Sequence, residues 1–332
     1  MGAKKNKKQS ELIIEELIKR SEACHKLVRT LMLSERIDYP ELSQALKHYF
    51  SYWNDFTHPG IFSIACEAVG TDPASQIEAQ AAVSMLGAAF DIHDDIIDSS
   101  KVKHQHPTVF GKYGQNVGLL LGNAFIIYGF TLMGKATNNL PAQKKNRIFT
   151  ILRRSLFDVG NAHASELGLR RKLDASPDEY LKIIEKKAAS IEADMNVAAI
   201  LGGGTTKECS ALARFGRIMG TLATLREEFI DVFDAEELNQ RINAEALPIP
   251  LLYAFQDKDS RKKIEKLLAS KKLNTQQIED LLDTVMDSRP VANLKTRMSN
   301  LITQAQNTLH VLQNERTRKL LADMAEATLE DL

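Results

Sequence analysis

Residues 81–98 read AAVSMLGAAFDIHDDIID, an uncharged stretch that runs directly into a group of aspartates. From Ala81 to Phe90 the residues are apolar or small on nearly every side, which is typical of a helix buried at the centre of a domain. At about 3.6 residues per turn, the four aspartates that follow lie on one face of the same helix: Asp91, Asp94, Asp95 and Asp98. The stretch therefore predicts a buried helix with an acidic end.

That acidic end indicates a bound cation. Like charges one helical turn apart repel, and the cost rises where they end an apolar helix. A multivalent cation resolves the conflict, and magnesium suits best, because it takes a few carboxylates and shares its other positions with water and phosphate oxygens. The alternative interpretation is a solvated helix end, since acidic runs are usually just solvated.

The rest of the chain is also patterned as helices. Apolar residues recur at helical spacing almost throughout, and the alternation typical of strands is nearly absent. Proline and glycine clusters divide the chain into about ten helices by the usual signals, at His58–Gly60, around Pro107, at Asn138–Pro141, at Gly202–Gly204, at Pro248–Pro250 and at Arg289–Pro290. No repeat or linker is visible, so we expect one helical domain over residues 11–332 and a disordered basic tail over residues 1–10.

Composition excludes several classes of function. The 332 residues, 44% of them hydrophobic, can bury a large core. Lys plus Arg equals Asp plus Glu at 43 each, so no overall charge favours nucleic acid or an anionic membrane. The cysteines (Cys24, Cys66 and Cys209) are odd in number and far apart, which favours a reducing, cytoplasmic compartment. No uninterrupted apolar run approaches a membrane span, so we expect no integral membrane protein.

A second acidic cluster follows at residues 226–231, REEFID. It comes after mostly apolar turns, Ile218–Leu225, and its carboxylates repeat the spacing of Asp94, Asp95 and Asp98. Two such clusters facing each other across a cavity would make a multi-metal clamp for a diphosphate leaving group. Taken alone, the second cluster is equally consistent with a surface charge run.

Several motifs together resemble those of the trans-isoprenyl diphosphate synthases. Residues 93–114, HDDIIDSSKVKHQHPTVFGKYG, are similar to the first aspartate-rich region of that family, in which DDxxD is followed by a basic pair and then by PTV and FG. EYLKIIEKKAAS at 179–190, the EExxD cluster and LPIPLLYA at 247–254 follow in the family's order. The resemblance covers roughly residues 45–330, and it implies a single all-α bundle of about ten or more helices around a deep central cavity.

The resemblance also implies roles for individual residues. Magnesium would be bound on one wall by Asp94, Asp95 and Asp98, and on the other wall by Glu227, Glu228 and Asp231. Lys103 matches the first arginine of the basic pair, and Lys187 matches the lysine of the KT motif. Both would bind the allylic diphosphate. The residues counted as catalytic are Asp94, Asp95, Asp98 and Lys187. The family commonly forms dimers, which implies a homodimer.

The half of the site that would hold the second substrate, isopentenyl diphosphate, departs from the family pattern. Four positions at which the family has cationic or histidine side chains are occupied by different residues: Asp55 for lysine and His58 for arginine in a GKxxRP-like loop, Gly87 for a helix histidine, and His104 for the second arginine. A carboxylate in place of lysine turns attraction for a diphosphate into repulsion. The acceptor site is therefore degenerate.

Departures around the second acidic cluster are milder. EExxD replaces DDxxD, Ala188 replaces the threonine of KT, and Gln240 stands where a lysine is usual. The segment between Asp234 and Pro248 is also short, with few basic residues.

Three hypotheses fit this pattern. The chain is a prenyl synthase whose acceptor pocket uses other residues, such as His58, His104 and Arg226; or it ionises an allylic diphosphate without isopentenyl diphosphate, as terpene synthases do; or it is a non-catalytic partner of a true synthase. In the two catalytic hypotheses, departure of diphosphate leaves a carbocation in a dry apolar cavity. The candidate cavity residues are Phe90, Ala89, Leu86 and Phe125.

Overall fold

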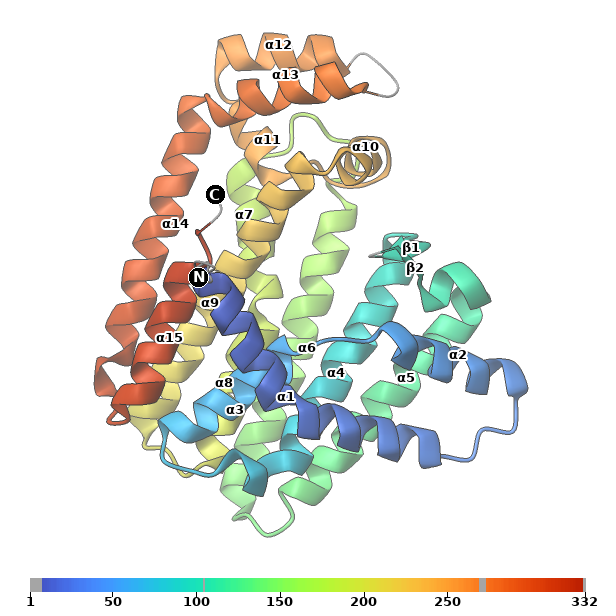
Figure 1. The fold of residues 1–332 in the computed structure, drawn as a ribbon, viewed down its shortest axis with the longest axis vertical. Helices are drawn as coiled ribbons and strands as arrows, with labels where there is room; N and C mark the ends of the chain where they lie inside the picture. The colour runs from blue at the N-terminus through green and yellow to red at the C-terminus, as the bar shows by residue number, and fades with distance from the viewer. Residues whose placement is uncertain (1–7, 104, 269–272, 331–332) are drawn as a thin grey trace, which may run out of the picture. The chain divides into compact units, whose positions relative to one another are not determined.

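The structure is a computed structural model, which describes residues 8–103, 105–268 and 273–330. It is almost entirely helical in these ranges, where the only β-structure is one two-stranded hairpin (Figure 1). The all-α fold predicted from the helical spacing is confirmed. Of the predicted tail over residues 1–10, residues 1–7 lie outside the described ranges, while Gln9 and Ser10 begin the first helix, α1 (Gln9–Ser34).

The chain forms two compact units. The first comprises the residues up to Thr150 with Asp194–Ser210 and Leu312–Arg318, and the second comprises Ile151–Ala193, Ala211–Val311 and the residues from Lys319. Four helices contribute to both: α6 (Ala142–Leu167), α8 (Ala189–Leu201), α9 (Thr206–Phe233) and α15 (Glu315–Ala327). The prediction of a single domain over residues 11–332 stays a prediction.

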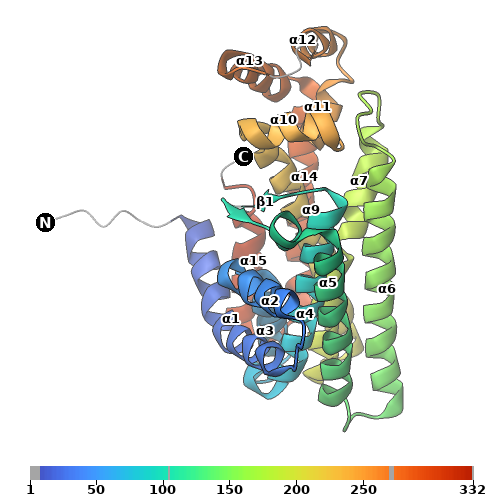
Figure 2. The same cartoon turned by 90° about the vertical axis from the view of Figure 1, so that its right-hand side faces the viewer.

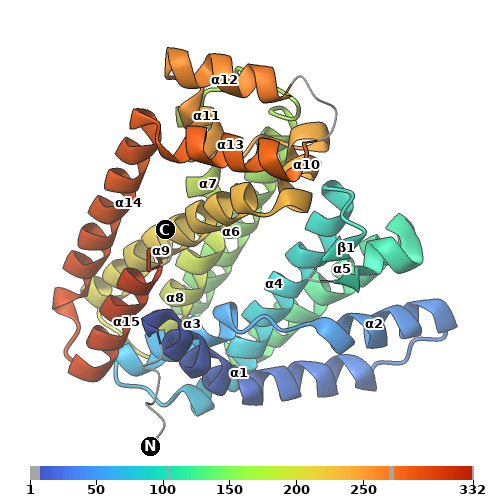
Figure 3. The same ribbon diagram turned by 45° about the horizontal axis from the view of Figure 1, so that its top comes forward.

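The first unit is built on α4 (Ile77–Ile97) and α5 (Val109–Ala136), which run side by side (Figures 1 and 3). As the uncharged sequence predicted, α4 is buried over most of residues 79–89. A Cβ atom at Gly129 would lie 3.0 Å from the carbonyl oxygen of Ala82, so glycine allows α5 to approach α4 closely. The unit also contains α1, α2 (Pro40–Tyr52), α3 (Thr57–Ala68) and the short 3-10 helix η1 (Pro73–Gln76).

Helix α5 corrects one expectation. The expectation that no segment is long and apolar enough to span a membrane is wrong for Val109–Ala136, which passes that test by length and composition. Of the most apolar 18-residue stretch of this helix, only 39% is buried. The core helix of a soluble protein passes the same test, so this one helix is weak evidence for a membrane span.

A small hairpin joins α4 to α5 (Figure 2). It pairs β1 (Val102–Lys103) with β2 (His106–Pro107) in antiparallel register. Thr108 then caps α5, because its side chain accepts a hydrogen bond of 2.9 Å from the backbone N–H of Gly111. A Cβ atom at Gly111 would lie 2.0 Å from the carbonyl oxygen of Lys101, so only glycine fits there. The PTVFG sequence thus fixes the turn that carries Lys103.

The second unit contains α7 (Pro177–Lys187) and a series of helices after α9. These are α10 (Ala235–Ala244), α11 (Ile249–Ala254), α12 (Lys258–Leu268), α13 (Thr275–Met286), α14 (Arg289–Thr308) and the short 3-10 helix η2 (Leu309–Val311). Helices α12 and α13 lie side by side (Figure 3), and the fully buried α11 contacts α7, α13 and α14.

Candidate active site

The first acidic cluster, Asp91, Asp94, Asp95 and Asp98, occupies the last turns of α4. Asp98 is the C-terminal cap, and its backbone N–H donates to the carbonyl oxygen of Asp94 at 2.8 Å. The side chain of Asp95 is only 4% exposed, whereas that of Asp91 is 35% exposed. The aspartates thus lie at the boundary between the buried helix and solvent, with Asp95 on its inner side.

Lys103 reaches this cluster from the hairpin. Its Nζ atom lies 2.5 Å from Asp91 Oδ1 and 3.8 Å from Asp95 Oδ1. Burial raises the pKa of Asp95 to about 7, although the positive charge of Lys103 opposes the shift. Asp95 Oδ2 is buried and has no hydrogen-bond partner among the residues that the structure describes. A cation at this oxygen would satisfy it.

The residues of the predicted degenerate acceptor site come together around His58. Asp55 Oδ1 accepts from the backbone N–H of His58 at 3.3 Å, and a Cβ atom at Gly87 would lie 3.1 Å from the His58 ring. His104 lies outside the described residues. The His58 Nδ1 atom pairs with Asp194 on α8, whose carboxylate is buried. The histidine ring therefore lies over the space left by Gly87 and is held there by an ion pair.

We expect this ion pair to make stability fall as pH rises above neutrality. Burial alone would lower the pKa of His58, but Asp194 and Asp55 raise it from 6.5 to about 9. A group with a raised folded-state pKa gives stability that is fully present below 6.5 and is lost as pH rises through about 9. The free energy of unfolding, measured with urea, should therefore fall by roughly 1–3 kcal/mol between about pH 7 and pH 9.5. His58→Gln should remove most of that pH dependence; an unchanged slope would contradict the assignment.

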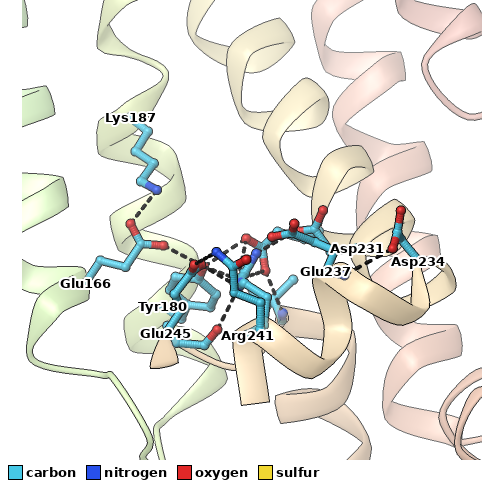
Figure 4. A network of polar contacts seen from close by, with 12 residues as sticks. Glu166, Tyr180, Lys187, Asp231, Asp234, Glu237, Arg241 and Glu245 are labelled. Carbon is cyan, nitrogen blue, oxygen red and sulfur yellow. Dashed lines mark hydrogen bonds and ion pairs between the residues drawn. The ribbon is translucent and has the colours of Figure 1, made fainter. Parts of the chain in front are cut away.

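The second acidic cluster, Glu227, Glu228 and Asp231, contains a buried cation from the same chain (Figure 4). Arg241 of α10 donates from Nη2 to Glu228 Oε1 and Oε2 at 3.0 and 3.1 Å, and its Nη1 pairs with Asp231. The Arg241 side chain is 7% exposed. By contrast, the Glu227 side chain is 65% exposed and pairs with its neighbour Arg226.

Lys187 also has a carboxylate partner, Glu166 of α6 (Figure 4). The Tyr180 hydroxyl lies 2.8 Å from Glu166 Oε1 and 2.8 Å from Glu228 Oε1, and it accepts from Arg241. Burial alone would raise the pKa of Glu166, but the ion pair with Lys187 lowers it below its usual value. One polar network therefore connects Lys187 to the second acidic cluster.

The predicted cavity residues have different environments. Leu86, Ala89 and Phe125 are buried, whereas Phe90 is partly exposed. The ring of Phe125 packs against that of Tyr49, with centroids 5.5 Å apart. These contacts place Phe125 in the core of the first unit. That the residues line a cavity, and that the two acidic clusters face each other across it, stay predictions.

Four polar residues of these networks were missed from the sequence: Arg241, Asp194, Glu166 and Tyr180. Asp194 lies 136 residues from His58, and Glu166 belongs to a different helix from Tyr180 and Lys187; nothing in the sequence around either acid marks it. Arg241 had a usable signal, because it is the only basic residue in the short acidic segment between Asp234 and Pro248. The contact of Arg241 with Glu228, however, depends on how that segment folds, which the sequence does not show.

The two clusters differ in how well they suit a metal. As the side chains lie, no group of three His, Cys, Asp or Glu residues within the described ranges could hold a metal ion. The first cluster still offers carboxylates at i, i+1 and i+4 and a buried oxygen of Asp95 that has no partner among the described residues, which is donor chemistry that suits magnesium. In the second cluster, Glu228 and Asp231 are already paired with a guanidinium group. The donor chemistry of the first cluster therefore suits magnesium better than that of the second, whose carboxylates Glu228 and Asp231 are already paired.

Known proteins share both the sequence and the fold. A short chain isoprenyl diphosphate synthase of Methanothermobacter thermautotrophicus is 26% identical over 302 residues, which are 87% of this chain and 90% of that protein. A geranylgeranyl diphosphate synthase of Sulfolobus acidocaldarius is 26% identical over 207 residues, or 62% of this chain and 63% of that one.

The fold matches that of a geranylgeranyl pyrophosphate synthetase from Pyrococcus horikoshii with a TM-score of 0.84 at 21% identity, over 97% of this chain and 99% of the other. The family pattern called Polyprenyl synthetase matches residues 39–285. With its all-helical fold and DDxxD-bearing helix, the chain belongs to the polyprenyl synthetase family and is an isoprenyl diphosphate synthase-like protein of the prenyltransferase type.

Proposed function

We propose that this protein ionises an allylic isoprenyl diphosphate with the help of magnesium and passes the prenyl group to an acceptor. The observation that carries the proposal is the acidic end of α4, where Asp95 is buried with one oxygen unsatisfied among the described residues and Lys103 lies alongside. A structural helix end has no use for a buried, unsatisfied carboxylate. A site that receives a cation and a diphosphate does.

Each residue of the first cluster has a role in this proposal. Asp94, Asp95 and Asp98 hold the magnesium, which when bound neutralises charge on the departing diphosphate. Lys103 contributes a positive charge at the same place, and its side chain is 40% exposed, so it can turn from Asp91 toward a phosphate. Lys187 is the second proposed diphosphate ligand, although it would first have to leave Glu166.

The acceptor is a separate question, and one observation favours an allylic substrate acting alone. Around His58 lie two carboxylates, Asp55 and Asp194, and the histidine itself is already paired with Asp194. The described positions of the predicted acceptor site (Asp55, His58 and Gly87) thus offer no unpaired positive charge for a second diphosphate. An enzyme whose carbocation cyclises or is captured by water fits this arrangement, while transfer to isopentenyl diphosphate fits the family relatives.

We expect weak binding of isopentenyl diphosphate to the natural protein. The variant Asp55→Lys, His58→Arg, His104→Arg should raise the affinity roughly tenfold or more, because each charge-assisted hydrogen bond contributes about 1.5–3 kcal/mol. Calorimetry with magnesium and a non-ionisable allylic analogue measures both proteins. Asp38→Lys, which adds a positive charge at an exposed position of the same unit, is the matched control and should change nothing. Tight binding of isopentenyl diphosphate by the natural protein would contradict a degenerate acceptor site and indicate an ordinary chain-elongating synthase.

Product analysis tests the proposed function as a whole. The purified protein is incubated with magnesium and geranyl, farnesyl or geranylgeranyl diphosphate, each with and without isopentenyl diphosphate. Longer prenyl diphosphates would identify a chain-elongating synthase. Prenyl alcohols or cyclic hydrocarbons formed without isopentenyl diphosphate would identify the allylic-only enzyme. No product with any substrate would leave only the non-catalytic partner subunit.

Two expectations concern the protein's context. We propose a cytoplasmic location, which is supported by three cysteines that are all buried and unpaired. We also propose a homodimer, by analogy with the family, and sedimentation of the purified protein would test it.

A further inference from the structure

The second acidic cluster already contains a cation, and its contacts leave little room for another. Arg241 bridges Glu228 and Asp231, and its Nε donates to the carbonyl oxygen of Ala246 at 2.8 Å. Arginine presents five donors in a planar fork that matches carboxylates. In this site the guanidinium spans two of the three carboxylates that the family resemblance assigns to a metal, Glu228 and Asp231.

Glu228 shows most directly that the cluster is satisfied without a metal. Besides Arg241, its Oε1 lies 2.8 Å from the Tyr180 hydroxyl, and its Oε2 accepts from the backbone N–H of Ile249 at 2.9 Å. An ionised carboxylate has about four acceptor positions; here Arg241 donates to both oxygens and Ile249 to Oε2, while the single hydrogen of the Tyr180 hydroxyl is shared between Glu228 and Glu166. A metal ion could bind Glu228 only by displacing donors that are themselves buried, which leaves them unsatisfied at a cost.

The local sequence explains why an arginine reaches this place. Asp234 caps α10 by accepting from the backbone N–H groups of Glu236 and Glu237 at 2.9 and 3.0 Å. Helix α10 therefore begins four residues after Asp231, so the chain changes direction directly after the second acidic cluster. Arg241 lies two turns into that helix and so points toward the end of α9 (Figure 4).

We infer that Arg241 is the resident cation of the second acidic cluster and takes the place of a divalent ion there, so that divalent metal binding depends on the first cluster alone. The inference rests on the proposed function in one respect, namely that the first cluster binds magnesium. It assigns Glu228 and Asp231 to a fixed ion-pair network instead of a metal clamp.

Manganese binding in the presence of inorganic diphosphate tests the inference, with the free ion followed by electron paramagnetic resonance. Glu227→Gln is the informative variant, because this exposed side chain can change without disturbing the network. Its manganese affinity should stay within about twofold of the natural protein, since one lost metal ligand would cost roughly tenfold or more. Asp95→Asn should lose manganese binding.

Removal of the Arg241 guanidinium should have the opposite effect, because it frees the second acidic cluster to bind a metal ion. Arg241→Met removes the guanidinium while keeping most of the side chain's volume, and it should gain one bound manganese ion. Arg241→Lys keeps the positive charge and should gain none. A folded Arg241→Met protein without an added manganese ion would overturn the inference. If that variant does not fold, Glu227→Gln decides alone, and a tenfold loss of affinity there would overturn it.

The outcomes separate this inference from the proposed function. Manganese binding that survives Asp95→Asn would contradict the metal site proposed at the first cluster, while the Glu227→Gln and Arg241→Met results would still decide the role of Arg241. Loss of binding in both Asp95→Asn and Glu227→Gln would keep the proposed function and remove the inference.

Discussion

Asp95→Asn reduces the release of diphosphate from an allylic substrate by roughly a thousandfold or more, because several kcal/mol of transition-state stabilisation disappear with the metal. The change keeps the size of the side chain and removes only its charge. Chelation of magnesium from the natural protein should have the same effect. Both rates follow from an assay of released diphosphate under saturating substrate.

Glu78→Gln is the matched control for this variant. Glu78 lies in the first turn of the same helix, α4, and pairs on the surface with Lys135. Glu78→Gln makes the same change of charge at the other end of the helix. Its rate of diphosphate release should stay within about twofold of the natural protein's, since exposed ion pairs contribute little. If Asp95→Asn kept most of its activity, some other site would be responsible for the reaction.

Arg241→Met lowers the free energy of unfolding by about 3–5 kcal/mol when no divalent metal is present, because it leaves the buried carboxylate of Glu228 and the half-buried carboxylate of Asp231 without their partner. Denaturant unfolding measures the loss. The double variant Glu228→Gln, Arg241→Met should recover part of it, since an amide tolerates burial better than an unpaired carboxylate.

The control for Arg241 is Arg217→Met in the same unit. The Arg217 side chain is 33% exposed and pairs with the half-buried Glu192, so solvent screens this pair more than the Arg241 network and its loss should cost only about 1 kcal/mol. Equal effects of the two substitutions would show that the Arg241 network contributes no more than a surface ion pair.

The sequence predicted the helices well where the pattern was periodic and long. The uncharged run before Asp91 predicted the buried helix α4, and the resemblance led to Lys103, which the hairpin does carry to the acidic end of that helix. The hairpin itself was not predicted, because two-residue strands are too short to show any alternation.

The prolines show a specific limit in predicting helix boundaries from the sequence. Pro59, Pro250 and Pro290 belong to segments that we interpreted as breaks between helices, yet each lies in the first turn of a helix, α3, α11 or α14. Proline is tolerated there because the first backbone N–H groups of a helix have no intrahelical partner. A proline therefore marks a helix start as readily as a helix end, and the sequence alone did not distinguish the two.

The polar networks were the least predictable part. Asp194 lies 136 residues from His58, and Arg241 lies 13 residues from Glu228 across the start of another helix. Neither pairing follows from helical spacing, because each depends on how separate helices pack. The motif assigned carboxylates to metals by type and spacing, whereas their partners are set by tertiary structure.

Magnesium-dependent release of inorganic diphosphate from an allylic diphosphate is the measurement that tests the central claim most directly. Geranyl, farnesyl and geranylgeranyl diphosphates are each supplied with magnesium, with a chelator, and with magnesium restored after chelation. We predict that at least one substrate releases diphosphate with magnesium, that the chelator stops the release, and that added magnesium restores it. Absence of release from all three, with or without isopentenyl diphosphate, or release that persists under chelation, would contradict the account.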